Sequence, residues 1–155
     1  METHFTWKSR FFSHSLEVFQ NEEKVGDLRN KAFTRSAEGT LKGRDLLFEI
    51  KGFFRQDMRI IDQKDGAVLF DVVIGNWRSK ATFTYNGRSY TWQYDNFWNT
   101  KFSINSDSGP VIRYHSFNFG GDIESYTNDE VLILTGLLIK NYFKQRAASA
   151  AAATT

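Results

Sequence analysis

The chain has 155 residues with 20 Lys and Arg against 18 Asp and Glu, a length that fits one domain. The two signs of charge are interleaved along the chain rather than clustered, which argues against a surface that binds nucleic acid. Because the chain has no cysteine, its sequence excludes disulfides, cysteine-bound zinc and thiol nucleophiles.

Pairs of short segments joined by polar turns follow one another along most of the chain. They predict β-hairpins, with strands over 16–19 and 24–28, 58–61 and 67–74, 81–85 and 88–94, and 101–104 and 111–114. The clearest turn is Asn86-Gly87, since both residues accept the positive φ of a type I′ turn. Apolar and polar residues alternate within several strands, which is typical of antiparallel sheets with one packed and one wet face.

A helix is predicted near the C-terminus. Residues 131–139 are apolar all round, so this helix must be enclosed by protein or lipid. Nine residues rise about 14 Å, about half of a bilayer's hydrocarbon core, which favours a buried core helix over a membrane span. Thr127 to Glu130 matches a capping box and predicts the start of the helix there. We expect the Ala-rich segment 147–155 to be an exposed tail, helical only in part.

Together these elements predict an all-β domain over 1–146 with one buried helix. The architecture that satisfies them is a closed antiparallel barrel of about ten to twelve strands around the hydrophobic C-terminal helix. Such a barrel has no free strand edges and offers an apolar interior. Eight strands leave room only for side chains, so a helix about 10 Å across requires a wider tube.

Three stretches carry a family resemblance: 59–69 with its apolar-Asp-x-x-Gly rhythm, 118–123, and the helix 131–139. Because these three stretches follow one another in this order, the chain resembles the tubby-like C-terminal superfamily over about 5–143. This superfamily includes the LURP-one-related proteins and the phospholipid scramblases. The resemblance implies a twelve-stranded antiparallel barrel threaded by the C-terminal helix, and a tubby-like domain implies binding of phosphoinositides. The chain lacks the Pro-rich arm and the acylated cysteines of scramblases.

The same resemblance draws attention to a set of acids before and at the start of the helix. Scramblase-like proteins have a calcium segment just before the helix, where this chain has Asp122, Glu124, Asp129 and Glu130. Calcium requires six to eight oxygen ligands at an ordered spacing, and these four acids are loosely spaced. Capping of the helix by these acids is the simpler interpretation, so we predict no metal site.

One group of basic residues forms a candidate binding site. Arg55 and Arg59 alternate with Asp57 onto one face of a predicted strand, and Lys51 lies close upstream; Lys51, Arg55 and Arg59 are predicted to form an anion patch for a lipid headgroup or a phosphate. The alternative is a solvated outer face that Asp57 neutralises.

Other candidate sites have simpler structural explanations. The three histidines, His4, His14 and His115, do not stand at a ligand spacing, and no Gly-x-Ser-x-Gly motif is present. Asp62 and Asp65 are expected to cap their own hairpin loop. The aromatic cluster Tyr90, Trp92, Tyr94, Phe97 and Trp98 could stack bases or sugars, but core filling explains it better.

The sequence therefore predicts a non-catalytic β-barrel binding module without a cofactor, which contacts anionic lipid. No signal peptide is evident, so a cytoplasmic location is expected, with no nucleic acid partner and no transmembrane span. Two alternatives remain open: a structural or protein-interaction domain that binds no lipid, and a carrier of a small hydrophobic ligand. The carrier requires an open cavity and fails if the helix plugs the barrel.

Overall fold

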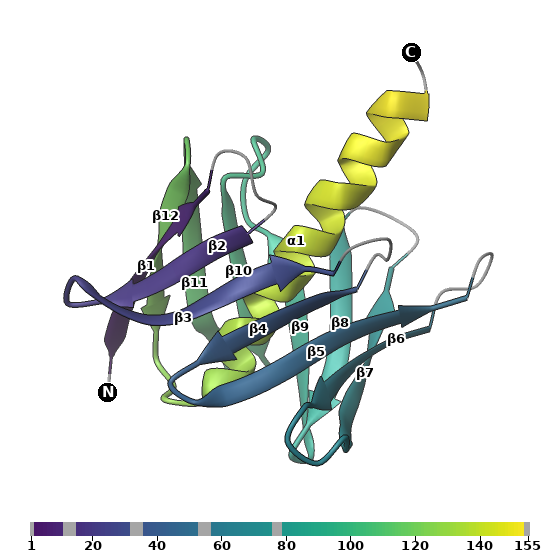
Figure 1. Ribbon diagram of the computed structural model, residues 1–155, viewed down its shortest axis with the longest axis horizontal. Helices are drawn as coiled ribbons and strands as arrows, with labels where there is room; N and C mark the ends of the chain where they lie inside the picture. The colour runs from purple at the N-terminus through teal and green to yellow at the C-terminus, as the bar shows by residue number, and fades with distance from the viewer. Residues whose placement is uncertain (1, 11–14, 32–35, 53–56, 76–78, 154–155) are drawn as a thin grey trace.

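The computed structural model describes residues 2–10, 15–31, 36–52, 57–75 and 79–153. They form twelve strands followed by one helix (Figure 1). The elements are β1 (Thr3–Ser9), β2 (Ser15–Gln20), β3 (Glu23–Asn30), β4 (Ala37–Leu41), β5 (Arg44–Lys51), β6 (Asp57–Asp62), β7 (Val68–Ile74), β8 (Lys80–Tyr85), β9 (Arg88–Tyr94), β10 (Lys101–Ser106), β11 (Gly109–Phe117), β12 (Gly120–Ser125) and α1 (Glu130–Ala153).

The strands form a closed antiparallel barrel, as the sequence predicts. Each strand pairs with the strands before and after it in the chain, and β12 pairs with β1 to close the barrel. The turn between β8 and β9 has the expected type I′ character, with φ of 51° at Asn86 and 75° at Gly87. The inward residues of the strands alternate with exposed ones, so the strands line a single interior.

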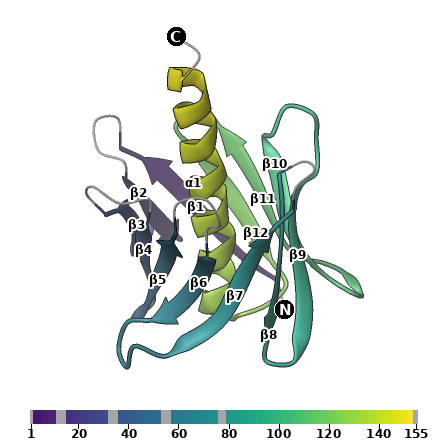
Figure 2. The same ribbon diagram turned by 90° about the vertical axis from the view of Figure 1, so that its right-hand side faces the viewer.

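The helix α1 occupies that interior (Figure 2). Apart from Gly136, residues 131–139 are each at most 3% exposed. Two side chains of the barrel wall hold the helix in register. The indole Nε1 of Trp92 donates to the carbonyl oxygen of Gly136 at 3.0 Å, and the Tyr114 hydroxyl donates to that of Ile133 at 2.9 Å. The helix is therefore the central part of the hydrophobic core.

The start of the helix differs in detail from the predicted capping box. The helix begins at Glu130, and its cap is Asp129, whose Oδ1 accepts from the Val131 amide at 3.0 Å. Thr127 hydrogen-bonds to the backbone just before the helix, because its hydroxyl oxygen accepts from the Asp129 amide at 3.2 Å. Asp129 also places a negative charge at the positive end of the helix dipole.

The end of the helix extends further than the sequence pattern indicates. Residues 147–153, predicted to be helical only in part, continue α1, and residues 147–151 are exposed. Both views show this last part of the helix projecting beyond the barrel (Figures 1 and 2). Alanine has the highest intrinsic helix propensity, so a preformed helix continues through an alanine run without apolar packing.

Burial inside the barrel has a consequence at alkaline pH. Burial raises the pKa of Tyr94 to about 12 and raises the pKa of Tyr114 well above its ordinary value of 10.0. Above pH 10 these phenols ionise in the unfolded chain but stay protonated in the folded one. The folded state then binds more protons, so both tyrosines lower the free energy of unfolding as pH rises above 10.

Below the raised pKa of Tyr94, about 12, we expect the tyrosinate absorbance of Tyr94 and Tyr114 to appear only when the protein unfolds. Denaturant unfolding between pH 9 and 12 measures the fall in stability, and Tyr114→Phe should make that fall shallower although its stability at neutral pH is lower. An equal slope in Tyr114→Phe would show that Tyr114 ionises freely in the folded protein.

Candidate functional site

The two ends of the barrel are built differently. At one end the strands are joined by tight turns such as Asn86-Gly87, and the chain enters α1 there. At the other end, which we call the exit end, α1 leaves the barrel (Figure 2). The loop 95–100 between β9 and β10 also lies at the exit end.

The loop 95–100 is held by hydrogen bonds that Asn96 organises. The Asn96 side-chain oxygen accepts from the amides of Thr100 and Lys101 at 3.0 and 3.1 Å, and its side-chain nitrogen donates to the Thr100 hydroxyl at 2.6 Å. Asn99 adopts a left-handed φ of 57°. An asparagine that bonds its own loop in this way fixes the backbone locally. The loop therefore presents its side chains from a defined conformation.

The side chains that this loop presents are aromatic and exposed. Phe97 is 89% exposed and Trp98 is 78% exposed, and the two rings contact each other edge to face at 5.5 Å between centroids. The prediction that both residues fill the core is wrong. It holds for Tyr90 and Trp92, which are 7% and 0% exposed. The loop carries Phe97 and Trp98 past the end of β9, where inward-outward alternation no longer decides burial.

A half-buried lysine of α1, Lys140, contacts the same loop. The Lys140 ammonium donates to the Asn99 carbonyl oxygen at 3.4 Å and to the Tyr94 hydroxyl at 3.3 Å. It also lies over the rings of Tyr94 and Phe102, at 5.0 and 5.6 Å from their centroids. Burial, and then the nearby charge of Lys144, lower the pKa of Lys140. The helix thus connects the barrel core to the loop that exposes Phe97 and Trp98.

Two more exposed aromatic residues lie next to this loop. Phe117 ends β11 and is 51% exposed, and Phe119 in the following turn is 63% exposed. The backbone connects the two places, because the Ser116 amide donates to the Thr100 carbonyl oxygen at 2.6 Å. We call Phe97, Trp98, Phe117 and Phe119 the aromatic platform.

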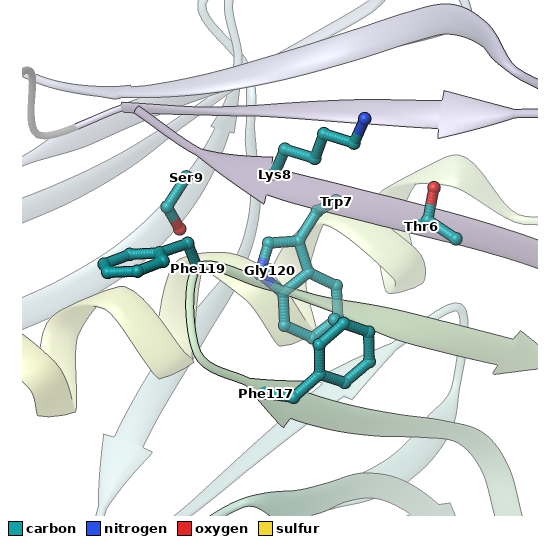
Figure 3. A pocket seen from close by; sticks show the side chains of 8 residues that line it. Thr6, Trp7, Lys8, Ser9, Phe117, Phe119 and Gly120 are labelled. Atoms are coloured by element: carbon teal, nitrogen blue, oxygen red, sulfur yellow. The ribbon is translucent and has the colours of Figure 1, made fainter. Parts of the chain in front are cut away.

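A shallow, mainly apolar hollow of about 510 Å³ adjoins the platform (Figure 3). Phe117 and Phe119 lie on either side of the Trp7 ring in this view. Gly121 makes the arrangement possible, since a Cβ atom at this position would lie 2.2 Å from the Trp7 ring. The hollow widens the apolar surface at the exit end beyond the four rings of the platform.

Cations outnumber acids at the exit end. Among the described residues that end strands, connect them or lie on α1 at the exit end, the acids are Asp57 and Asp95. The cations there are Arg10, Lys31, Lys51, Lys80, Lys101, Lys140, Lys144 and Arg146. Arg10 is paired with Glu17 at 2.5 Å. The exit end therefore combines exposed aromatic rings with an excess of positive charge.

The predicted anion patch lies partly within the described residues. Lys51 and Arg59 share one acid, since the Lys51 Nζ and the Arg59 Nε lie 3.5 and 3.7 Å from the same oxygen of Glu49. Asp57 lies opposite Lys51 in the antiparallel register of β5 and β6. Arg55 lies outside the described residues. The described part of the patch thus holds as many acids as bases, and the binding of anions there stays a prediction.

Four of the acidic residues considered in the sequence analysis accept hydrogen bonds from backbone amides or from a neighbouring side chain. Glu124 accepts a short hydrogen bond from the Tyr126 hydroxyl, and Asp129 caps α1. Asp62 and Asp65 accept from the amides of Lys64 and Ala67 in their own hairpin loop, as predicted. Within the described ranges, no three or more His, Asp or Glu residues gather as metal ligands would.

Comparison of the sequence and the structure with known proteins finds no match. Over the described residues, α1 included, no helix combines the length and the apolar character needed to span a bilayer. The chain matches no known protein family model, no curated protein and no solved structure.

Proposed function

We propose that this protein is a non-catalytic binding module that docks its exit end on anionic membrane surfaces. The observation that carries this proposal is the aromatic platform, whose most exposed members, Phe97 and Trp98, are held on a hydrogen-bonded loop and flanked by lysines. A soluble domain gains nothing from rigidly exposing a phenylalanine and a tryptophan to water. Aromatic rings gain free energy at the boundary between lipid headgroups and acyl chains.

The magnitudes favour a membrane surface with negative charge. Complete removal of a phenylalanine side chain from water contributes about 1.5–3 kcal/mol. Each lysine or arginine near an anionic surface adds about 1 kcal/mol, and this attraction is screened within a Debye length. Two inserted rings with four or five nearby cations therefore suffice for stable but reversible binding that depends on salt.

The filled interior supports a surface site over a ligand chamber. A carrier of a small hydrophobic ligand needs space at the barrel axis, and residues 131–139 of α1 occupy that space. Twelve antiparallel strands around a C-terminal helix also support the proposed relation to the tubby-like superfamily. A protein-interaction domain without lipid binding is the competing function, and the following experiment distinguishes it.

The test is flotation with vesicles of phosphatidylcholine alone and of phosphatidylcholine with phosphatidylserine. We expect the protein to float only with the anionic vesicles, and less at 0.5 M salt. Replacing Phe97 and Trp98 together by serine should reduce the bound fraction at least about tenfold, since this removes more than about 1.4 kcal/mol of apolar transfer.

Two sets of variants serve as controls for this experiment. Val68→Ser removes an apolar side chain that is 49% exposed but lies at the start of β7, at the end of the barrel opposite the exit end, so it should bind like the wild type. Lys51→Gln with Arg55→Gln and Arg59→Gln tests the predicted anion patch separately. No flotation of the wild type would favour the protein-interaction function, and equal flotation of all variants would contradict docking through Phe97 and Trp98.

A further inference from the structure

One of the twelve interfaces between strands is incomplete. β7 and β8 pair only through Val73 with Thr82 and Ile74 with Ala81, both close to the exit end. The pair β8 and β9 is matched along its whole length, from Lys80 with Gln93 to Tyr85 with Arg88. Residues 68–72 of β7 and 83–85 of β8 therefore have no partner across the gap between them, which we call the seam. Figure 2 shows the two strands diverging away from the exit end.

Aromatic side chains fill the inside of the seam. The Phe70 ring stacks on the Phe83 ring at 4.7 Å between centroids and contacts the Tyr85 ring at 5.4 Å. Phe70 and Phe83 are 6% and 4% exposed, so the core is closed here although the backbone ladder is open. The register between β6 and β7 shifts between Ile60 and Ile61, where Leu69 of β7 is an extra residue, and a β-bulge of this kind bends the strand that carries it.

The outer side of the seam has few of the features that protect a free strand edge. Natural edges are protected by lysines, prolines or a covering element. Here Val68 and Val73 of β7 are 49% and 61% exposed, and Thr82 and Thr84 of β8 are exposed. The only charged residue of 68–72 and 83–85 is Asp71, for which the described residues show no ion pair.

We propose that the seam is a binding site for an extended peptide strand of a partner protein, distinct from the exit end. The amide and carbonyl groups of 68–72 and 83–85 that face the seam have no strand partner across it, and a polypeptide in β-conformation offers them a matching ladder, as in recognition by strand addition. A lipid or a small solute offers no regular ladder of donors and acceptors.

The chemistry of the seam defines the peptide it prefers. In a strand, alternate side chains point to opposite faces. The inward-facing positions of the bound strand would lie against the Phe70 and Phe83 rings, which favours apolar β-branched residues. At least one outward-facing position would lie near Asp71, which favours lysine or arginine. A second copy of this chain fits less well, because its own strands are already paired inside a closed barrel.

The test uses amide hydrogen exchange on isotopically labelled protein, followed by NMR. In the free protein we expect the amides of 68–72 and 83–85 that face the seam to exchange much faster than those of β8 that face β9. The probe is the acetylated and amidated peptide Val-Thr-Val-Lys-Val-Thr-Val. It should slow exchange at the seam amides, while the same peptide with N-methylated residues at alternate positions should not, because it lacks those donors.

A charge variant tests the contact with Asp71. Asp71→Lys should weaken binding of the probe about fivefold and improve binding of the peptide with glutamate in place of lysine, since exposed pairs are worth up to about 1 kcal/mol. Asp122→Lys, on the exposed face of β12, is the matched control and should bind the probe normally. Seam amides that are already protected in the free protein, or no response to the probe, would overturn the proposal. Protection that depends on protein concentration alone would assign the seam to a second copy instead.

Discussion

Replacing Leu134 by aspartate is expected to abolish folding. Leu134 is 0% exposed in the buried first part of α1, and one of its methyl groups lies 3.2 Å from where a Cβ atom of Gly39 in β4 would be. An aspartate there would be enclosed by strands on every side. An unpaired charge buried in this way costs several kcal/mol, a large part of the stability of an ordinary domain. Circular dichroism and the yield of soluble protein measure the result.

Two further variants make this first prediction quantitative. Leu134→Ala should fold and lose about 2–5 kcal/mol of unfolding free energy, the usual cost of this truncation in a core. Ala148→Asp changes an exposed residue of the same helix beyond the barrel and should alter stability by less than about 0.5 kcal/mol. If Leu134→Asp were folded and as stable as the wild type, the helix would have to lie outside the barrel.

Replacing Gly136 by alanine is expected to destabilise the protein by about 3 kcal/mol. In most helix interiors this substitution stabilises by about 1 kcal/mol, because glycine is a poor helix former. Here the added Cβ atom would lie 2.0 Å from the hydroxyl oxygen of Tyr114 and 2.3 Å from the ring carbon that bears it. Tyr114 cannot move aside easily, since its ring stacks on Phe102 at 4.5 Å and its hydroxyl donates to the Ile133 carbonyl. Overpacking of this severity outweighs the gain in helix propensity.

A double-mutant cycle shows whether Tyr114 causes the effect. In a Tyr114→Ala background the ring is absent, so Gly136→Ala should become neutral or stabilising by up to about 1 kcal/mol. Unfolding in urea for the four proteins gives the coupling energy between the two positions. A stabilising Gly136→Ala in the wild-type background would mean that Tyr114 does not lie over the helix.

The architecture was predictable because its determinants are local or compositional. The apolar run 131–139 requires enclosure whatever surrounds it, and Asn86-Gly87 specifies a turn from two residues alone. A barrel with room for a helix follows from these elements and from the strand alternation. The cap of the helix is Asp129 and not, as the sequence pattern predicts, Thr127. Both side chains accept backbone hydrogen bonds, and the sequence alone does not show which of them caps the helix.

The surfaces proposed for function were not predictable in the same way. Phe97 and Trp98 continue the aromatic series of β9, and their exposure depends on the loop that Asn96 fixes beyond the end of that strand. The seam depends on how β7 diverges from β8, although residues 68–74 have a strand pattern like the others. Both features result from tertiary geometry, which neither residue pattern encodes on its own.

The position of Trp98 on a membrane tests the proposed function most directly. Trp7 and Trp92 are buried, so Trp98 dominates the solvent-sensitive fluorescence once Trp77, which lies outside the described residues, is replaced by phenylalanine. With phosphatidylserine-containing vesicles we expect a blue shift of its emission and strong quenching by lipids brominated on their acyl chains. Binding to these vesicles without a shift or quenching of Trp98 would contradict docking through the exit end.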